Sequence, residues 1–417
     1  MNEIYLSMVF DGNVVSVMAA TKSKTGVITP LATESQEIRP TDNPCGVISV
    51  NDDNRLAVSS ILRKILNKIE GNNEITGIYL GIMPRSMHGE CIEVRRDFQG
   101  KHRITVHDIE ALDREVVRNI NDTVVAIYDN GFVRDGLETL NVRNELADSV
   151  VRKSVAVVVS PRHMPDLREL FGKDVRLHAV VPTQVAIARV VADDEQRVNG
   201  VMSFHIGNRT SGLTYMLNDM VMGTAVVPFG FDHILNDMTL GEVAVEKMRS
   251  FVISPQMKYK CSNGATIRFS NDGPTISLIR SLEAFNARIR EIFSLGYDRI
   301  LASLNLDELK VPVLLTSSLI NTHEFAEAVS DLLEQDCVAA NASNVLDDDN
   351  FSNPKYVPLI ALVNEATKPC IEEVTVEITS NPPRTPDLRK DSDKPKEKRK
   401  SAFVMIKEQL FNLTDEE

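Results

Sequence analysis

The residues that could act as nucleophiles, acids or metal ligands are scattered along this chain. The five cysteines include no CxxC pair and the histidines show no HxxxH spacing, so no zinc site is predicted. Neither a GxSxG motif nor a P-loop is present. His233 follows Asp232 and precedes Asp237, a grouping that could do acid–base chemistry. The same residues also fit the start of a helix, and we favour that capping role.

Glycines at the turns of two strand–turn–strand patterns are more informative. The first pattern spans 4–20 with Asp11-Gly12-Asn13 at its turn, and the second spans 201–217 with Gly207 at its turn. Two halves that each open on a hairpin are typical of the actin and sugar-kinase superfamily. The sequence therefore predicts an α/β, actin-like two-lobe fold of the duplicated, ribonuclease H-like kind.

Periodic apolar residues place further elements around these hairpins. The predicted helices are at 56–69, 164–171, 183–191, 232–238, 243–251, 276–293, 324–333 and 356–367, and the predicted buried strands at 75–82, 155–159 and 311–315. The polar stretch 84–152 interrupts the alternation and indicates an inserted subdomain. The predicted division is a first-lobe core at 1–83 with 153–180 and 340–372, an inserted subdomain at 84–152, a second-lobe core at 181–250 with 301–339, a small subdomain at 251–300, a linker at 373–400 and a terminal helix at 401–417.

The composition excludes several classes of function. The formal net charge of -13 would repel a phosphate backbone, so no nucleic-acid partner is expected. No apolar run approaches the roughly 18 residues that span a bilayer, and the N-terminus lacks the basic region of a signal peptide. Widely spaced cysteines fit reduced thiols in the cytoplasm. We therefore expect a cytoplasmic protein whose membrane contact, if any, is peripheral.

The C-terminal region combines a linker with an amphipathic segment. Residues 373–400 are rich in proline and charge and cannot bury a core, which predicts a disordered linker. A basic cluster ends at Lys400, and the apolar residues after it fall on one half of a helical wheel. This pattern favours binding to anionic lipid, although a helix packed on the protein's own core or on a partner has the same pattern. The predicted membrane-binding residues are Lys400, Phe403, Val404, Ile406, Lys407, Leu410 and Phe411.

The segment 226–239, VVPFGFDHILNDMT, is similar to an FtsA-family segment of the form IPxGGDHxTNDI. Collinear likenesses occur at 78–87 (IYLGIMPRSM), 287–293 (ARIREIF) and 355–363 (KYVPLIALV). The chain thus resembles a divergent member of the bacterial FtsA family over roughly residues 4–370, and the insertion at 84–152 lies where that family carries its extra subdomain.

The resemblance implies an actin-like adaptor of cell division. Such proteins bind ATP between two lobes and self-associate into filaments. They hold the C-terminal peptide of the tubulin-like protein FtsZ, and further division proteins would be additional partners. They dock by their last helix on the inner face of the cytoplasmic membrane at the division site.

The family's nucleotide-binding pattern is only partly present here. The family forms DIGTSK and DIGGGTTD correspond to 9–14 and 205–212, where the acids become Val9, His205 and Gly212. Asp11 stands where a glycine should approach phosphate, and the bulk of Arg209, which could pair with a phosphate, fills the second turn. The third family form, TGGGA, is Thr316-Ser317-Ser318-Leu319-Ile320.

Six residues remain as candidate nucleotide contacts by resemblance: Gly12, Gly207, Thr210, Ser211, Glu246 and Lys247. The last two also fit a solvated helix face. Because phosphate needs free backbone N–H groups and Mg²⁺ needs carboxylates, we expect ATP binding to be weak or lost, Mg²⁺ binding to be doubtful and ATP hydrolysis to be absent.

The resemblance also places a partner groove on the small subdomain at 251–300, where basic residues face an acidic peptide. Arg280, Arg288 and Arg290 lie on or beside its long helix and are the candidates, although ordinary surface arginines would look the same. Two other functions stay open. One is an active ATPase or kinase of the same fold, and the other is a PilM-like scaffold of a cell-envelope machine, which shares the fold and the insertion.

Overall fold

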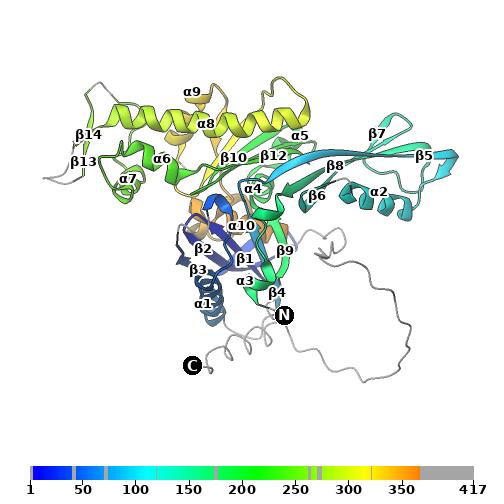
Figure 1. Cartoon of the computed structure of the whole chain (residues 1–417), viewed down its shortest axis with the longest axis horizontal. Helices are drawn as coiled ribbons and strands as arrows, with labels where there is room; N and C mark the ends of the chain where they lie inside the picture. The colour runs from blue at the N-terminus through cyan, green and yellow to red at the C-terminus, as the bar shows by residue number, and fades with distance from the viewer. Residues whose placement is uncertain are drawn as a thin grey trace.

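The computed structural model describes residues 3–39, 44–69, 74–118, 120–172, 177–261, 264–269, 275–320 and 322–366. These residues form two stacked lobes and an arm that projects from one side (Figure 1). The linker predicted at 373–400 and the helix predicted at 401–417 lie outside them. None of the helices in the described ranges combines the length and the apolar character needed to cross a bilayer.

The first lobe is built on a five-stranded sheet in the order β3-β2-β1-β4-β9. Its strands are β1 (Glu3–Asp11), β2 (Val14–Lys22), β3 (Ile28–Glu37), β4 (Glu74–Ile82) and β9 (Leu177–Pro182). β2 is antiparallel to both of its neighbours, β1 and β3, and β4 and β9 run parallel to β1. Alternate residues of β1 face two different cores: Leu6 packs with the helix α1 (Asp52–Lys68), whereas Val9 packs on the opposite side. This double burial explains why β1 is apolar from Ile4 to Phe10 apart from the buried Ser7.

The second lobe repeats this topology with the order β12-β11-β10-β15-β16. Its strands are β10 (Val201–Ile206), β11 (Ser211–Leu217), β12 (Met220–Val227), β15 (Val313–Ser317) and β16 (Cys337–Ala339). Here too the first three are antiparallel and the last two run parallel to the first. The predicted duplicated two-lobe α/β fold is therefore confirmed.

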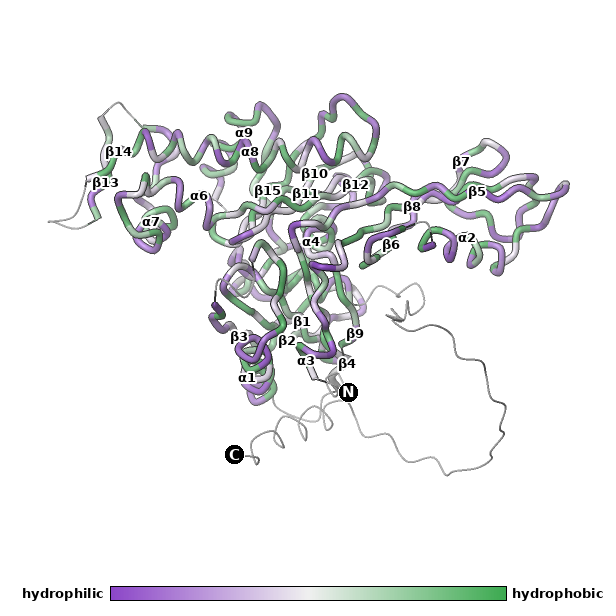
Figure 2. Tube along the Cα trace, in the orientation of Figure 1, coloured by the Kyte–Doolittle hydropathy of each residue, from purple (hydrophilic) through white to green (hydrophobic). Residues whose placement is uncertain are grey.

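Helices form the remaining layers. The outer face of the second sheet packs against α6 (Phe231–Met238), α8 (Leu278–Leu304) and α9 (His323–Leu333) in one hydrophobic core. Between the two sheets lie α4 (Thr183–Val191) and α10 (Val357–Glu365), which share a second core with residues of both sheets. Figure 2 shows hydrophobic residues gathered along the central strands of both lobes. The short helices are α3 (Leu167–Phe171), α5 (Asp194–Asn199) and α7 (Val245–Val252).

The inserted subdomain forms the arm. It contains β5 (His88–Arg103), α2 (Val106–Arg118), β6 (Thr123–Arg134), β7 (Leu137–Thr139) and β8 (Leu146–Val159). These strands extend the second-lobe sheet in the order β12-β5-β8-β6-β7, with His88 of β5 paired to Ala225 of β12. The sequence assigns 155–159 to the first lobe, whereas the structure has these residues as the end of β8. Val155 and Val157 nevertheless pack into the first-lobe core.

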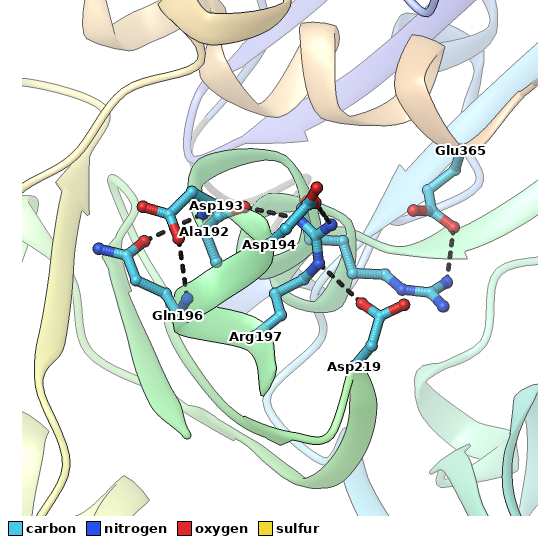
Figure 3. A network of polar contacts seen from close by, with 8 residues as sticks. Ala192, Asp193, Asp194, Gln196, Arg197, Asp219 and Glu365 are labelled. Atoms are coloured by element: carbon cyan, nitrogen blue, oxygen red, sulfur yellow. Dashed lines mark hydrogen bonds and ion pairs between the residues drawn. The ribbon is translucent and has the colours of Figure 1, made fainter. Parts of the chain in front are cut away.

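Ion pairs stabilise α4 and α5, the helices that lead from β9 of the first sheet to β10 of the second. Arg197 of α5 donates to the carboxylate of Asp219 at 2.7 Å, donates to the carbonyl oxygen of Ala192 at 2.6 Å and pairs with Asp194 (Figure 3). Nearby, Arg189 of α4 lies 3.1 Å from a carboxylate oxygen of Glu365 at the end of α10. The helices that separate the two sheets are thus linked to each other by charge as well as by packing.

Candidate functional site

The turns of the two hairpins meet across the space between the lobes. Gly12 has φ +66° in the β1–β2 turn, and a Cβ added to it would lie 2.8 Å from the Cβ of Asn208 in the β10–β11 turn. A Cβ added to Gly207 would lie 3.0 Å from Oδ1 of Asp11. Both predicted glycines therefore allow a direct approach of one turn to the other.

The Asp11 carboxylate bridges the two turns. Its Oδ1 accepts the backbone N–H of Asn208 at 2.7 Å, and its Oδ2 accepts the side-chain amide of Asn208 at 3.1 Å. Burial raises the pKa of Asp11, although the nearby Ser318 hydroxyl and the hydrogen bond from the Asn208 backbone favour the ionised form. A phosphate at this place would compete for the same N–H and meet a carboxylate. In this structure that N–H group therefore has a carboxylate of the protein itself as its acceptor.

An ionic network continues from the second turn. The Nε of Arg209 lies 3.2 Å from Oδ2 of Asp232, and Arg249 of α7 pairs with the other carboxylate oxygen. Arg249 also donates to the side-chain oxygen of Asn208 at 3.4 Å. The backbone N–H of Asp232, in the first turn of α6, donates to the carbonyl oxygen of Asn208 at 2.8 Å. Arg209, a residue that could pair with a phosphate, is thus paired within the protein.

The start of α6 is pressed against the same turn. A Cβ on Gly230 would lie 2.4 Å from the carbonyl oxygen of Gly207, so only glycine fits there without a backbone shift. The Nδ1 of His233 accepts the backbone N–H of Gly230 at 3.1 Å, which agrees with the predicted capping role. Burial, together with the nearby Arg209 charge, lowers the pKa of His233.

Thr210 and Ser211, two further predicted nucleotide contacts, order the turn itself. The carbonyl oxygen of Thr210 accepts the N–H of Gly207 at 3.0 Å. The hydroxyl of Ser211 donates to the carbonyl oxygen of Phe229 at 2.8 Å. Both residues are buried, and these contacts fix the path of the chain from β12 into α6.

His205 replaces an acid of the family pattern and lies in the interior. Its Nδ1 shares a hydrogen bond of 3.0 Å with the hydroxyl of Thr316, the first residue of the third element. Burial lowers the pKa of His205 to about 3, so the imidazole is neutral at physiological pH. In the same element, the hydroxyl of Ser317 accepts the N–H of Ile320 at 2.7 Å and donates to its carbonyl oxygen.

Met83 is a residue of this site that sequence reasoning missed. A Cβ added to Gly212 would lie 2.9 Å from its sulfur, and a Cβ added to Gly207 would lie 3.4 Å from its terminal methyl group. The thioether therefore runs along the second hairpin, in contact with the glycines that face the first lobe. Its place directly after β4, inside the stretch IYLGIMPRSM, was the available signal.

Glu246 and Lys247, the last two predicted nucleotide contacts, do not face the hairpin turns. They line an open groove of about 620 Å³ between α7 and β13 (Thr266–Arg268), whereas Arg249 is the residue of α7 that contacts the hairpin. The other residues lining this groove are Ser250, Phe251, Ser254, Gln256, Thr266, Ile267, Arg268, Phe269 and Leu278.

The three predicted partner-binding arginines differ in their surroundings. Arg288 is held on α8 by Asp237 at 2.7 Å and by Glu291 at 2.6 Å, and its guanidinium lies 4.8 Å from the centre of the Phe229 ring. Arg290 donates to the carbonyl oxygen of Leu332 at 3.2 Å. Arg280 is exposed in the first turn of α8.

The seven predicted membrane-binding residues, from Lys400 to Phe411, lie outside the described residues. Within the described ranges, no group of three or more His, Cys, Asp or Glu side chains is arranged to hold a metal ion.

The repeated sheet topology and the paired hairpin turns define this chain as an actin-like protein. Its structure is similar to that of a chain in the PilM–PilN type IV pilus biogenesis complex, with a TM-score of 0.51, 13% identity, and 88% of this chain and 99% of that one covered. MreB5 of Spiroplasma citri with bound AMPPNP aligns with a TM-score of 0.46 and 11% identity, over 88% of this chain and 96% of that one.

The sequence comparison narrows the class. No protein-family model matches the chain. It is 22% identical to the cell division protein FtsA of Porphyromonas gingivalis (strain ATCC BAA-308 / W83) over 396 residues, which cover 91% of this chain and 81% of that protein. The chain therefore has the actin fold and resembles FtsA in sequence over most of its length.

Proposed function

We propose that this protein is a cytoskeletal adaptor of cell division that binds the C-terminal peptide of FtsZ and holds FtsZ filaments at the inner face of the cytoplasmic membrane. The observation that carries the proposal is the similarity to FtsA over 91% of the chain. The actin-like fold supports it, because the two-lobed body is suited to self-association into filaments. The basic, amphipathic sequence at 394–413 supports peripheral binding to anionic lipid at the division site.

The groove between α7 and β13 is the place we propose for the FtsZ peptide. Its apolar wall contains Phe251 and Phe269, whose rings pack edge to face at 6.1 Å. Lys247 and Arg268 line the same groove and would attract an acidic peptide. Arg280 remains a candidate beside it, whereas the Arg288 guanidinium is already paired with Asp237.

Co-sedimentation with anionic liposomes, with and without purified FtsZ, tests the adaptor function. We expect the full chain to carry FtsZ into the pellet, and the deletion of 401–417 to leave both proteins in solution. Lys247→Glu combined with Arg268→Glu should leave lipid binding intact but lose FtsZ, because the groove would then repel an acidic peptide. Lys24→Glu, on the exposed β2–β3 turn, is the matched control.

Sedimentation of the 401–417 deletion with liposomes would show that the anchor lies elsewhere. Undiminished FtsZ recruitment by the double groove variant would place the peptide at another surface.

We also propose that the adaptor does not hydrolyse ATP and binds it weakly or not at all. Support comes from the replaced acids of the family pattern and from the Asp11 carboxylate at the hairpin turns. Titration of a fluorescent ATP analogue with Mg²⁺ should show no saturation in the micromolar range, and phosphate release should equal the protein-free rate. Micromolar binding that Gly207→Asp abolishes would contradict this.

A scaffold of the PilM kind is the second candidate, favoured by the structural similarity that covers 99% of the PilM–PilN complex chain. A pull-down that presents the FtsZ C-terminal peptide and a pilus inner-membrane peptide side by side separates the two functions. Retention of only the pilus peptide would replace the division role with the scaffold role.

A further inference from the structure

We propose that the Asp11 carboxylate is a built-in anion that holds the two lobes together in place of a nucleotide phosphate. This goes beyond the adaptor function, because it concerns how the body keeps one shape with no ligand. Asp11 ends β1 in the first lobe, and its acceptor atoms are directed at Asn208 in the second lobe.

The geometry of this contact is that of an anion held by a turn. Backbone N–H groups at a glycine-containing turn bind anions because they are fixed donors with no partner of their own. Here the N–H of Asn208, directly after Gly207, donates to Asp11 at 2.7 Å, and the Asn208 side chain adds a second donor at 3.1 Å. One carboxylate therefore receives two donors from one turn.

Charged side chains surround the contact between Asp11 and Asn208, which we call the clamp. Arg209 and Arg249 both pair with Asp232, and the Arg249 charge also acts to lower the pKa of Asp11. Arg249 also reaches the side-chain oxygen of Asn208, so the amide that binds Asp11 is itself oriented. The contact between Asp11 and Asn208 is therefore supported by an ionic network within the protein.

Two uncharged contacts also join the first lobe to the second lobe near the hairpin turns. The thiol of Cys45, in the first lobe, donates to the carbonyl oxygen of Pro228, in the second lobe, at 3.6 Å. Gly12 approaches Asn208 so closely that any side chain at position 12 would separate the turns. The clamp is thus a specific contact within a close-fitting junction between the lobes.

The distance between the lobes tests the proposal directly. Nitroxide labels carried on an unnatural amino acid at positions 56 and 295 would report it by double electron–electron resonance and leave the native cysteines in place. Leu56 on α1 is 68% exposed and Leu295 on α8 is 38% exposed, on the outer faces of the two lobes. The full-length chain should give one narrow distance distribution that ATP and Mg²⁺ do not change.

Asp11→Ala should lengthen the distance between the labels and broaden its distribution. Formate supplies the missing carboxylate and should narrow the distribution again. Chloride at equal ionic strength should not. Asn13→Ala, in the same turn, leaves the carboxylate in place and should behave like the wild type. Should Asp11→Ala fail to fold, Asn208→Ala carries the test, since it removes one of the two hydrogen bonds and should broaden the distribution. An unchanged distribution in the variant tested, or equal effects of formate and chloride on Asp11→Ala, overturns the proposal.

Discussion

Arg152→Ala should destabilise the arm by about 3 kcal/mol, the low end of the range for breaking a buried ion pair, because the two carboxylates that Arg152 pairs with are 39% and 40% exposed. The Arg152 side chain is only 5% exposed on β8. Its Nε lies 2.9 Å from a carboxylate oxygen of Asp113 in α2, and its Nη1 lies 2.7 Å from one of Asp129 in β6. Its guanidinium also lies 4.7 Å from the centre of the Phe132 ring. Removing it leaves two carboxylates facing each other without a cation, and burial already raises the pKa of Asp113.

Hydrogen exchange followed by mass spectrometry, on peptides from 88–159, would measure the loss of stability. In Arg152→Ala we expect faster exchange that is confined to the arm. The neighbouring Lys153→Ala is the matched control, because its pair with Glu138 at 2.8 Å is exposed to solvent, which screens the attraction between the two charges. Adding Asp113→Asn and Asp129→Asn to Arg152→Ala should restore part of the protection. Equal exchange in Arg152→Ala and Lys153→Ala would show that the buried cation does not stabilise the arm.

His205 should make the folded protein sensitive to mild acid. Its pKa falls from about 6.5 in an unfolded chain to about 3 in the folded state, so between these values only the unfolded chain takes up the proton. A depressed histidine pKa therefore gives stability that is present above about pH 6.5 and is lost as the pH falls. Within this window the free energy of unfolding falls by about 1.4 kcal/mol for each pH unit below 6.5. At pH 5 the loss amounts to about 2 kcal/mol.

Urea unfolding at pH 7.5 and pH 5.0, compared between the wild type and His205→Asn, isolates this contribution. Asparagine keeps a polar atom near Thr316 but does not titrate. The wild type should lose about 2 kcal/mol more than the variant between the two pH values. Equal losses would mean that the imidazole takes up its proton in the folded state.

Most elements of the two lobes were predictable because they follow from local periodicity. The strand predicted at 201–206 is β10 without a change of bounds, and the first hairpin has the predicted turn. The long helix was predicted to end at 293, but α8 continues to Leu304. Gly296 resembles a helix end in the sequence. In the structure it lets α8 approach β11, since a Cβ there would lie 2.4 Å from Cδ1 of Leu213.

The arm and the site depend on contacts between distant segments. The sequence indicates an insertion at 84–152, but not that β5 would pair with β8 or extend the second-lobe sheet. It also identifies Gly12, Gly207 and the replaced acids. The bond from Asn208 to Asp11 joins residues 197 positions apart, and the packing of Met83 on the second hairpin is equally non-local. Neither could be read from spacing along the chain.

The attachment of the arm has a mechanical consequence. The chain enters the arm from β4 of the first lobe, yet β5 pairs with β12 of the second lobe and the side chain of Asn130 donates to the backbone of Val221 at 3.0 Å. The arm and the second lobe therefore share one continuous sheet, although Val155 and Val157 at the base of the arm also pack into the first-lobe core. Any rotation between the lobes swings the tip of the arm relative to the first lobe, and the length of β5 and β8 enlarges a small angle into a large displacement.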